Sequence, residues 1–111
     1  MKILTVCERN NNRSVVLASI LREERGERDV ISCGIQTFSA ETLNMLCEWA
    51  DKIVLVDEML RYQFYFDPYV AKIVIIPLGG DRWGYNHNAD LQDLIRSKLD
   101  ETIYTSKFSR V

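Results

Sequence analysis

The 111-residue sequence predicts one α/β domain, a three-layer sandwich in which helices cover both faces of a four-stranded parallel sheet. Four short runs of mostly β-branched and aliphatic residues stand apart along the chain, at 3–6, 30–33, 53–56 and 73–76. Uninterrupted apolar runs of this length are typical of strands buried on both faces. Because helical segments separate the runs, we expect parallel strands joined by right-handed crossovers.

Helices are expected between and after these strands. Apolar residues recur at helical spacing over 15–24, and a second helix begins after Ser39, a favourable N-cap. A weaker, aromatic-rich helix is expected over 58–66, closed by the Asp67-Pro68 pair because proline disfavours helix in the residue before it. The last helix is expected from Ala89 or Asp90 to about residue 99.

The composition excludes several classes of protein. Apolar residues make up 47% of the chain, charged residues 27%, and the net charge is −2, which fits a folded globular protein and argues against a nucleic-acid binder. The first apolar run, 3–6, is too short for a signal-peptide core or a membrane span. We therefore expect a cytoplasmic protein with neither nucleic-acid nor membrane partners.

The three cysteines, Cys7, Cys33 and Cys47, are an odd number without metal-ligand spacing. Neither a disulfide framework nor a zinc site is indicated, and we expect free thiols in a reducing compartment. Cys33 and Cys47 occupy apolar positions in a strand and a helix and are expected in the core. We expect no metal and no cofactor.

The most informative segment begins directly after the first strand and ends in the first helix. It sets Cys7 and Arg13 six positions apart and continues with Ser14. The unpaired N–H groups and positive dipole end of a helix N-terminus bind an oxyanion and favour a thiolate. Arginine adds a planar fork of donors that grips two oxygens, and the Ser14 hydroxyl can donate to the thiolate. The segment therefore predicts a phosphate-binding loop with a nucleophile, whose interior binding residues are Glu8, Arg9, Asn10, Asn11 and Asn12.

A second segment is expected at the same edge of the sheet, because it follows the fourth strand. Residues 77–85 contain the Gly79-Gly80 pair, which permits an unusual backbone path, and then Asp81, Trp83 and Tyr85. In open parallel sheets ligands bind beyond the carboxyl ends of the strands. We expect this segment to lie across the loop from Cys7.

With these residues in view, the chain resembles the low-molecular-weight protein tyrosine phosphatase family, in a short bacterial or viral branch, over residues 1 to about 99. The family's loop, Cys, five residues, Arg, Ser, is matched at Cys7, Arg13 and Ser14, and its bracing asparagine at Asn10. The resemblance implies a flavodoxin-like fold of the low-molecular-weight phosphatase type.

The sequence departs from the family pattern at three places. Arg9 stands where glycine is usual, Val15 where proline is usual, and Asn12 where larger members carry a second, protective cysteine. An arginine at the rim would favour an acidic substrate or point to solvent. Without the second cysteine, redox protection by that route is absent.

The resemblance implies a mechanism for a phosphomonoester hydrolase, most simply a protein tyrosine phosphatase. Cys7 attacks phosphorus, Arg13 holds the equatorial oxygens, and an aspartic acid protonates the leaving oxygen. The family's Asp-Pro spelling is matched at Asp67, but the chain order, with the acid after the fourth strand, favours Asp81. Trp83 and Tyr85 would wall the pocket and favour phosphotyrosine.

Three other functions stay open on the sequence. The loop could serve a phosphate or phosphopeptide binding module with little turnover, an arsenate reductase, or a phosphocarrier with a phosphorylated cysteine. An arsenate reductase would need further cysteines near the site, and Cys33 and Cys47 are not on loops. A phosphocarrier would not require Arg13. The expected partners are a phosphorylated protein or a small phosphomonoester, with inorganic phosphate or sulfate also binding in the loop.

Overall fold

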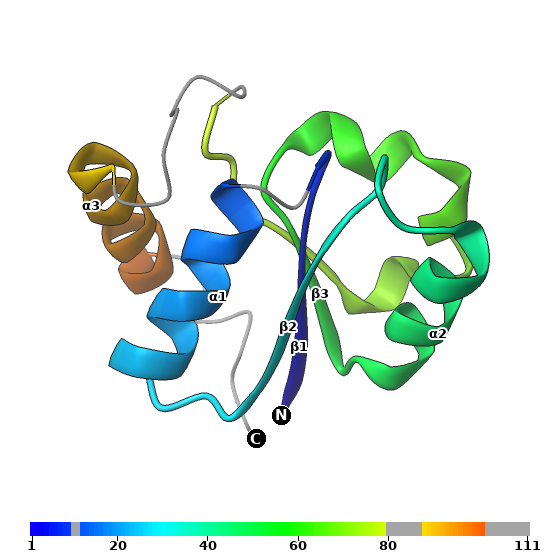
Figure 1. Cartoon of the computed structure of the whole chain (residues 1–111), viewed down its shortest axis with the longest axis horizontal. Coiled ribbons are helices and arrows are strands. Elements are labelled where there is room, and N and C mark those ends of the chain that lie inside the picture. The colour runs from blue at the N-terminus through cyan, green and yellow to red at the C-terminus, as the bar shows by residue number, and fades with distance from the viewer. Residues whose placement is uncertain (10–11, 80–87, 102–111) are drawn as a thin grey trace.

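A four-stranded parallel sheet forms the centre of the computed structural model, which describes residues 1–9, 12–79 and 88–101. The strands are β1 (Lys2–Cys7), β2 (Asp29–Gly34), β3 (Lys52–Leu55) and β4 (Ile73–Ile75), in the spatial order β2-β1-β3-β4 (Figure 1). The predicted sheet is confirmed.

Two of the predicted strands extended one residue too far, to Val56 and Ile76. Both residues still continue the hydrogen-bonding ladder, because the Val56 N–H donates to the Val6 carbonyl and the Ile76 N–H donates to the Leu55 carbonyl. The apolar pattern therefore predicts the buried segment that is hydrogen bonded to its neighbours, which is one residue longer than β3 and β4 at the carboxyl end.

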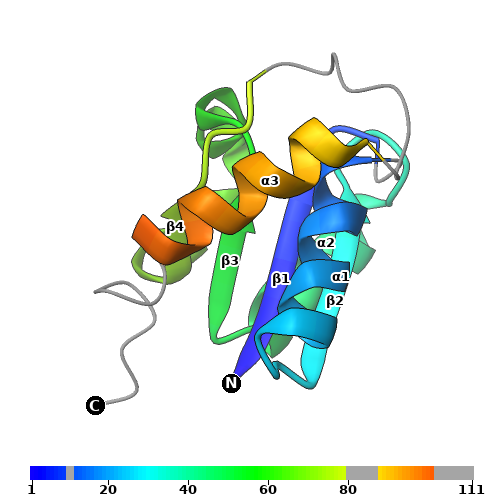
Figure 2. The same ribbon diagram turned by 90° about the vertical axis from the view of Figure 1, so that its left-hand side faces the viewer.

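Helices cover both faces of the sheet, which gives the expected three layers. Helices α1 (Arg13–Glu24) and α3 (Ala89–Lys98) lie together on one face, and α2 (Ala40–Trp49) lies on the other (Figure 1). Figure 2 views the molecule from the side of α1 and α3, with both helices in front of the strands. Ser39 caps α2 as predicted, since its Oγ accepts the Thr42 N–H at 3.1 Å.

The prediction of a helix over 58–66 closed by the Asp67-Pro68 pair is wrong. The segment forms two 3₁₀ helices, η1 (Glu58–Tyr62) and η2 (Phe64–Lys72), and η2 continues past Pro68. At Tyr69 the backbone angles, φ −116° and ψ 16°, are not helical, so η2 consists of short turns joined at a kink. Short turns tolerate proline because the N–H groups of a first turn need no partner within the helix.

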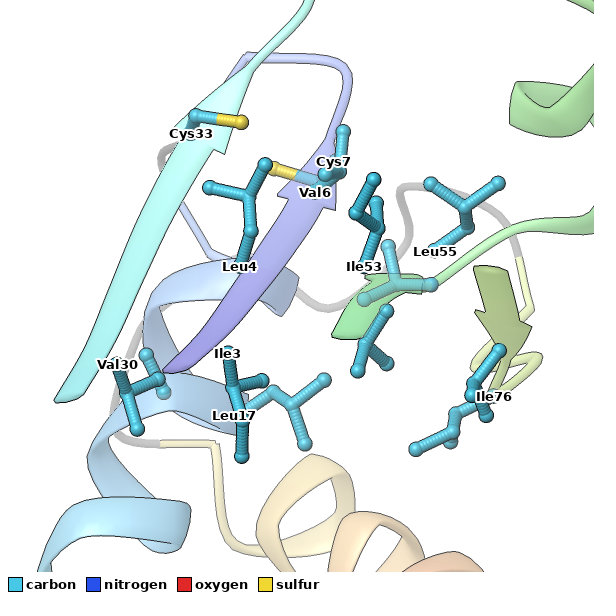
Figure 3. Close-up of a cluster of buried hydrophobic side chains, with 14 of the residues drawn as sticks. Ile3, Leu4, Val6, Cys7, Leu17, Val30, Cys33, Ile53, Leu55 and Ile76 are labelled. Atoms are coloured by element: carbon cyan, nitrogen blue, oxygen red, sulfur yellow. The ribbon is translucent and has the colours of Figure 1, made fainter. Parts of the chain in front are cut away.

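Buried apolar side chains surround β1, the strand that precedes the connection from Cys7 to Arg13. Ile3, Leu4 and Val6 are at most 1% exposed and pack among side chains from the neighbouring strands and from Leu17 of α1 (Figure 3). Because both faces and both edges of β1 are covered, its carboxyl end is held in place on every side. Among the described residues, no helix is both long and apolar enough to cross a lipid bilayer.

Candidate functional site

The candidate site lies where β1 ends and α1 begins. Cys7 is the last residue of β1 and Arg13 is the first residue of α1, so residues 8–12 form the connection at the carboxyl edge of the sheet. The chain leaves β1 toward β2 on one side and returns to β3 on the other. This change of direction is where open α/β sheets form a ligand-binding crevice.

A buried contact joins the thiol of Cys7 to the first turn of α1. The Cys7 Sγ and the Ser14 Oγ are hydrogen bonded at 3.0 Å, and the Ser14 hydroxyl also lies 3.5 Å from the Cys33 carbonyl. The Thr5 hydroxyl donates to the Ser14 carbonyl at 2.8 Å. These hydrogen bonds fasten the first turn of α1 to β1. The Cys7 sulfur therefore lies next to the positive N-terminal end of the helix.

Arg13 is buried and is held by two groups from distant parts of the chain. Its Nη1 donates to the Gly79 carbonyl at 2.9 Å and lies 3.6 Å from the Asp57 Oδ2. The Asp57 Oδ1 accepts the Met59 N–H at 3.0 Å, so the same carboxylate caps η1. Gly79 has φ 76°, in the left-handed region that favours glycine, and this backbone path presents its carbonyl to Arg13. In the described part of the chain, both contacts of the guanidinium are made by Nη1.

The segment after β2 supports the start of the loop from the other side. The Ile35 N–H donates to the Cys7 carbonyl at 3.0 Å, and the Gln36 N–H donates to the Glu8 carbonyl at 2.7 Å. Arg9 is exposed at the rim, and its Nε donates to the Gln36 Oε1 at 3.4 Å. Because the carbonyls of Cys7 and Glu8 accept hydrogen bonds from the segment after β2, the backbone at the start of the loop is held in one orientation.

Asn12 differs from the other polar residues of the site. It is 2% exposed and precedes α1, where its carbonyl accepts the Val16 N–H, but its side chain makes no capping hydrogen bond. Neither its amide nitrogen nor its amide oxygen has a hydrogen-bond partner among the groups that the structure describes.

The structure brings several of the predicted site residues together and leaves others undescribed. Cys7 contacts Ser14, which directly follows Arg13 in the first turn of α1, and Glu8, Arg9 and Asn12 belong to the same connection. Five predicted site residues lie outside the described residues: Asn10, Asn11, Asp81, Trp83 and Tyr85.

The alternative acid, Asp67, is exposed on η2. This segment is anchored to the last turn of α2, where the Tyr69 hydroxyl donates to the Glu48 Oε1 at 3.1 Å and the Lys72 Nζ donates to the Cys47 carbonyl at 2.9 Å. Helix α2 runs antiparallel to the strands, so its last turn lies toward their amino ends, whereas Cys7 lies at their carboxyl ends.

Sequence reasoning missed Asp57 and the Gly79 carbonyl. Asp57 directly follows the third apolar run, 53–56, and side chains at that position meet the first loop at the same edge of the sheet. That placement could have revealed Asp57. Segment 77–85 is expected at this edge of the sheet, but nothing in the sequence indicates that the Gly79 carbonyl would bond to Arg13, because a backbone oxygen carries no residue type.

The other two cysteines are core residues, as predicted. Cys33 and Cys47 are 0% exposed. Burial raises the pKa of the Cys33 thiol to about 12, with a further contribution from the nearby Cys47. Burial also raises the pKa of Cys47, to about 11, against a lowering influence of Lys72. Both thiols are therefore protonated and unreactive near neutral pH.

The arrangement can bind an oxyanion and attack its central atom. The Cys7 sulfur contacts the Ser14 hydroxyl at the N-terminus of α1, and the buried Arg13 is the first residue of that helix. A helix N-terminus and a guanidinium both favour negative charge. Within residues 1–9, 12–79 and 88–101, no group of three or more His, Cys, Asp and Glu side chains could hold a metal ion.

Solved structures resemble this chain along nearly its whole length. The tyrosine phosphatase amsI of Erwinia amylovora has 14% identity and a TM-score of 0.64, over 91% of this chain and 92% of its own. The YwlE arginine phosphatase of Geobacillus stearothermophilus has 16% identity and a TM-score of 0.62, over 99% and 97%. A low molecular weight protein tyrosine phosphatase of Bacillus subtilis has 19% identity and a TM-score of 0.59, over 96% and 99%.

The chain has the low-molecular-weight phosphatase fold. This confirms the predicted fold class, a flavodoxin-like three-layer sandwich. No protein-family model matches the sequence, and no curated protein matches it either.

The different surroundings of the three thiols predict an order of chemical modification. At pH 8, iodoacetamide should modify Cys7 first, while Cys33 and Cys47 stay unmodified in the folded protein because the thiolate is the reactive form. Their modification should become appreciable only as the pH rises toward about 11 and 12, or after unfolding. Peptide mapping by mass spectrometry measures this order, and modification of Cys33 or Cys47 ahead of Cys7 at pH 8 would contradict it.

Proposed function

We propose that this protein is a phosphomonoester hydrolase that acts as a protein tyrosine phosphatase through a cysteinyl-phosphate intermediate. The observation that carries the proposal is the 3.0 Å contact of the Cys7 sulfur with the Ser14 hydroxyl, at a helix N-terminus and beside the buried Arg13. When Cys7 is ionised, the Ser14 hydroxyl is the donor in this contact and stabilises the thiolate. The N-terminus of α1 and Arg13, the residue before Ser14, supply the positive charge that a phosphoryl dianion requires.

In the first step the Cys7 thiolate attacks phosphorus, an S–P bond forms, and the bond from phosphorus to the leaving oxygen breaks. Asp81 in its acid form gives its proton to the leaving oxygen. In the second step water attacks phosphorus, Asp81 accepts a proton from that water, and the S–P bond breaks. Inorganic phosphate leaves, and the thiolate is restored.

Arg13 is the second residue on which the chemistry depends. Its Nη1 is held by the Gly79 carbonyl and lies near Asp57, which fixes the guanidinium. We propose that the donors on Nη2 and Nε grip two phosphoryl oxygens. Charge on the equatorial oxygens is part of the transition state, so a guanidinium already in position stabilises it without reorganisation.

Asp81 is preferred over Asp67 as the acid on the ground of chain position. Asp81 comes after β4 in the sequence, two positions beyond Gly79, whose carbonyl accepts a hydrogen bond from Arg13. Asp67 belongs to η2, which is anchored to the last turn of α2. Trp83 and Tyr85 are proposed to wall the pocket, which would favour an aromatic leaving group and a phosphorylated protein or small phosphomonoester as substrate.

The residues described above also bear on the two rival functions, an arsenate reductase and a binding module. An arsenate reductase relay is disfavoured, because Cys33 and Cys47 are fully buried and protonated. A binding module without turnover differs from the enzyme only in the rate of the first step. Since similar structures carry the names tyrosine phosphatase and arginine phosphatase, phosphotyrosine and phosphoarginine should be compared as substrates. We infer a cytoplasmic location, where a catalytic thiol remains reduced.

Replacement of the nucleophile tests the proposed reaction. Cys7→Ser should abolish hydrolysis of p-nitrophenyl phosphate while retaining phosphate binding, because the hydroxyl is a far weaker nucleophile but the oxyanion donors remain. Steady-state kinetics and phosphate-dependent thermal stabilisation are the two measurements. Cys47→Ala, a core cysteine on the other face, should retain hydrolysis. A Cys7→Ser variant as active as the wild type would refute the assignment, and a wild type that binds phosphate without hydrolysis would favour the binding module.

The identity of the acid is tested by a matched pair of variants. Asp81→Asn should lower kcat for p-nitrophenyl phosphate by roughly 10² to 10⁴, the usual contribution of general acid catalysis. Asp67→Asn should have little effect, since this side chain is exposed on η2. The reverse result, with Asp67→Asn impaired and Asp81→Asn normal, would show that Asp67 is the acid.

The role of Asp57 is tested by removing its charge and keeping its shape. Asp57→Asn should lower kcat/KM by roughly threefold to tenfold, because Arg13 loses a charged neighbour in a partly buried setting. The amide oxygen can still cap η1, so a fall in melting temperature would report the lost charge beside the buried Arg13 and not a lost cap. Asp51→Asn, whose carboxylate accepts the Lys2 N–H away from the site, is the control and should leave kcat/KM unchanged. Equal kcat/KM in all three proteins would exclude a positioning role for Asp57.

A further inference from the structure

The buried side-chain amide of Asn12 is the least explained polar group in the described site. It is 2% exposed, and neither its nitrogen nor its oxygen has a partner among the described groups. An unsatisfied buried amide is energetically costly, and native proteins rarely keep one without a reason. An amide in this state needs a partner that arrives with a ligand or with water.

The position of Asn12 makes the absence of a capping bond informative. Asparagine is among the most favourable N-cap residues, and Asn88 does cap α3, since its Oδ1 accepts the Leu91 N–H at 3.0 Å. Asn12 stands at the equivalent position of α1 but has φ −149° and ψ −81°, and its amide does not reach the N–H groups of the first turn. Those N–H groups are therefore not occupied by the side chain that would normally cap them.

The neighbouring residues define what kind of ligand fits. Asn12 directly precedes the buried Arg13 and lies in the same connection as Cys7, whose sulfur contacts the first turn of α1. A helix N-terminus without a side-chain cap, a buried guanidinium and a buried amide donor all favour an oxyanion.

From these observations we propose that the side-chain amide of Asn12 is itself a ligand of the bound phosphoryl group. This inference rests on the proposed function and adds to it. The sequence indicates Asn12 only as one of five interior loop residues, and the proposed function assigns the oxyanion to the helix N-terminus and Arg13. Nδ2 donates to a phosphoryl oxygen, and water that enters with the oxyanion donates to Oδ1. The substrate then satisfies an amide that has no partner among the described residues, so part of the binding selectivity for an oxyanion resides in this side chain.

The test compares sulfate binding by the wild type, Asn12→Leu, Asn12→Asp and Asn44→Leu. Sulfate is a convenient probe because it remains a dianion across the neutral range. Its Kd is obtained from the rise in melting temperature with sulfate concentration at pH 7.5, which also gives the melting temperature of each ligand-free protein. Asn44→Leu makes the same chemical change at an exposed position of α2 and is the matched control.

The inference predicts a specific ranking of affinities. Asn12→Leu should bind sulfate roughly 10- to 100-fold more weakly, as expected for the loss of a hydrogen bond to a charged group. Asn12→Asp should bind more weakly still, because a carboxylate of the same shape repels the dianion. Ligand-free Asn12→Leu should melt no lower than the wild type, since an apolar side chain of similar size has no unsatisfied polar atoms. Asn44→Leu should bind sulfate like the wild type.

A structural role for Asn12 would give the opposite ranking. Asn12→Asp, which keeps the shape and one acceptor, would then bind sulfate better than Asn12→Leu, and ligand-free Asn12→Leu would melt below the wild type. Either result overturns the inference, as does a sulfate Kd of Asn12→Leu within threefold of the wild type. Failure of both Asn12 variants to fold would also assign the residue a structural role.

The outcome separates this inference from the proposed function. If the wild type neither binds sulfate nor hydrolyses p-nitrophenyl phosphate, the proposed function fails and the ligand role of Asn12 fails with it. If the wild type does both and Asn12→Leu matches its sulfate Kd, only the inference about Asn12 fails.

Discussion

The site depends on one constraint, the enclosure of β1 by neighbouring strands and helices, which fixes the position of its carboxyl end. β1 pairs with β2 on one edge and with β3 on the other, and helices cover both of its faces. Cys7 at its end therefore has one position, and the bond from the Thr5 hydroxyl to the Ser14 carbonyl sets α1 against that position. A thiol and a helix N-terminus are held together by the core rather than by the loop between them.

The buried Arg13 shows how the fold compensates the burial of a charge. Burial of a guanidinium is costly unless hydrogen bonds and an opposite charge accompany it. Gly79 supplies a carbonyl from beyond β4 and Asp57 supplies a carboxylate from beyond β3, so two strand ends converge on one side chain. Because Asp57 also caps η1, the orientation of the arginine is tied to the segment that follows β3.

The three cysteines show that placement, and not residue type, decides the chemistry. Cys33 and Cys47 are enclosed by apolar groups on a strand and a helix, where burial raises the pKa of both thiols. Cys7 lies at the sheet edge, next to a hydroxyl and a helix N-terminus. One chain thus keeps two inert thiols among apolar groups and holds a third, also buried at 2% exposure, against the N-terminus of α1.

The strands of the sheet, the described α-helices and the spacing of Cys7, Arg13 and Ser14 could be predicted from the sequence, because they follow from local apolar patterns and from residues close together along the chain. The three-dimensional fold set the roles of Asp57 and the Gly79 carbonyl, which depend on the order of the strands. It also decided the 3₁₀ path of 58–72 and the unsatisfied burial of Asn12. Such features arise from contacts between distant segments, and no local pattern encodes which neighbours a side chain will have.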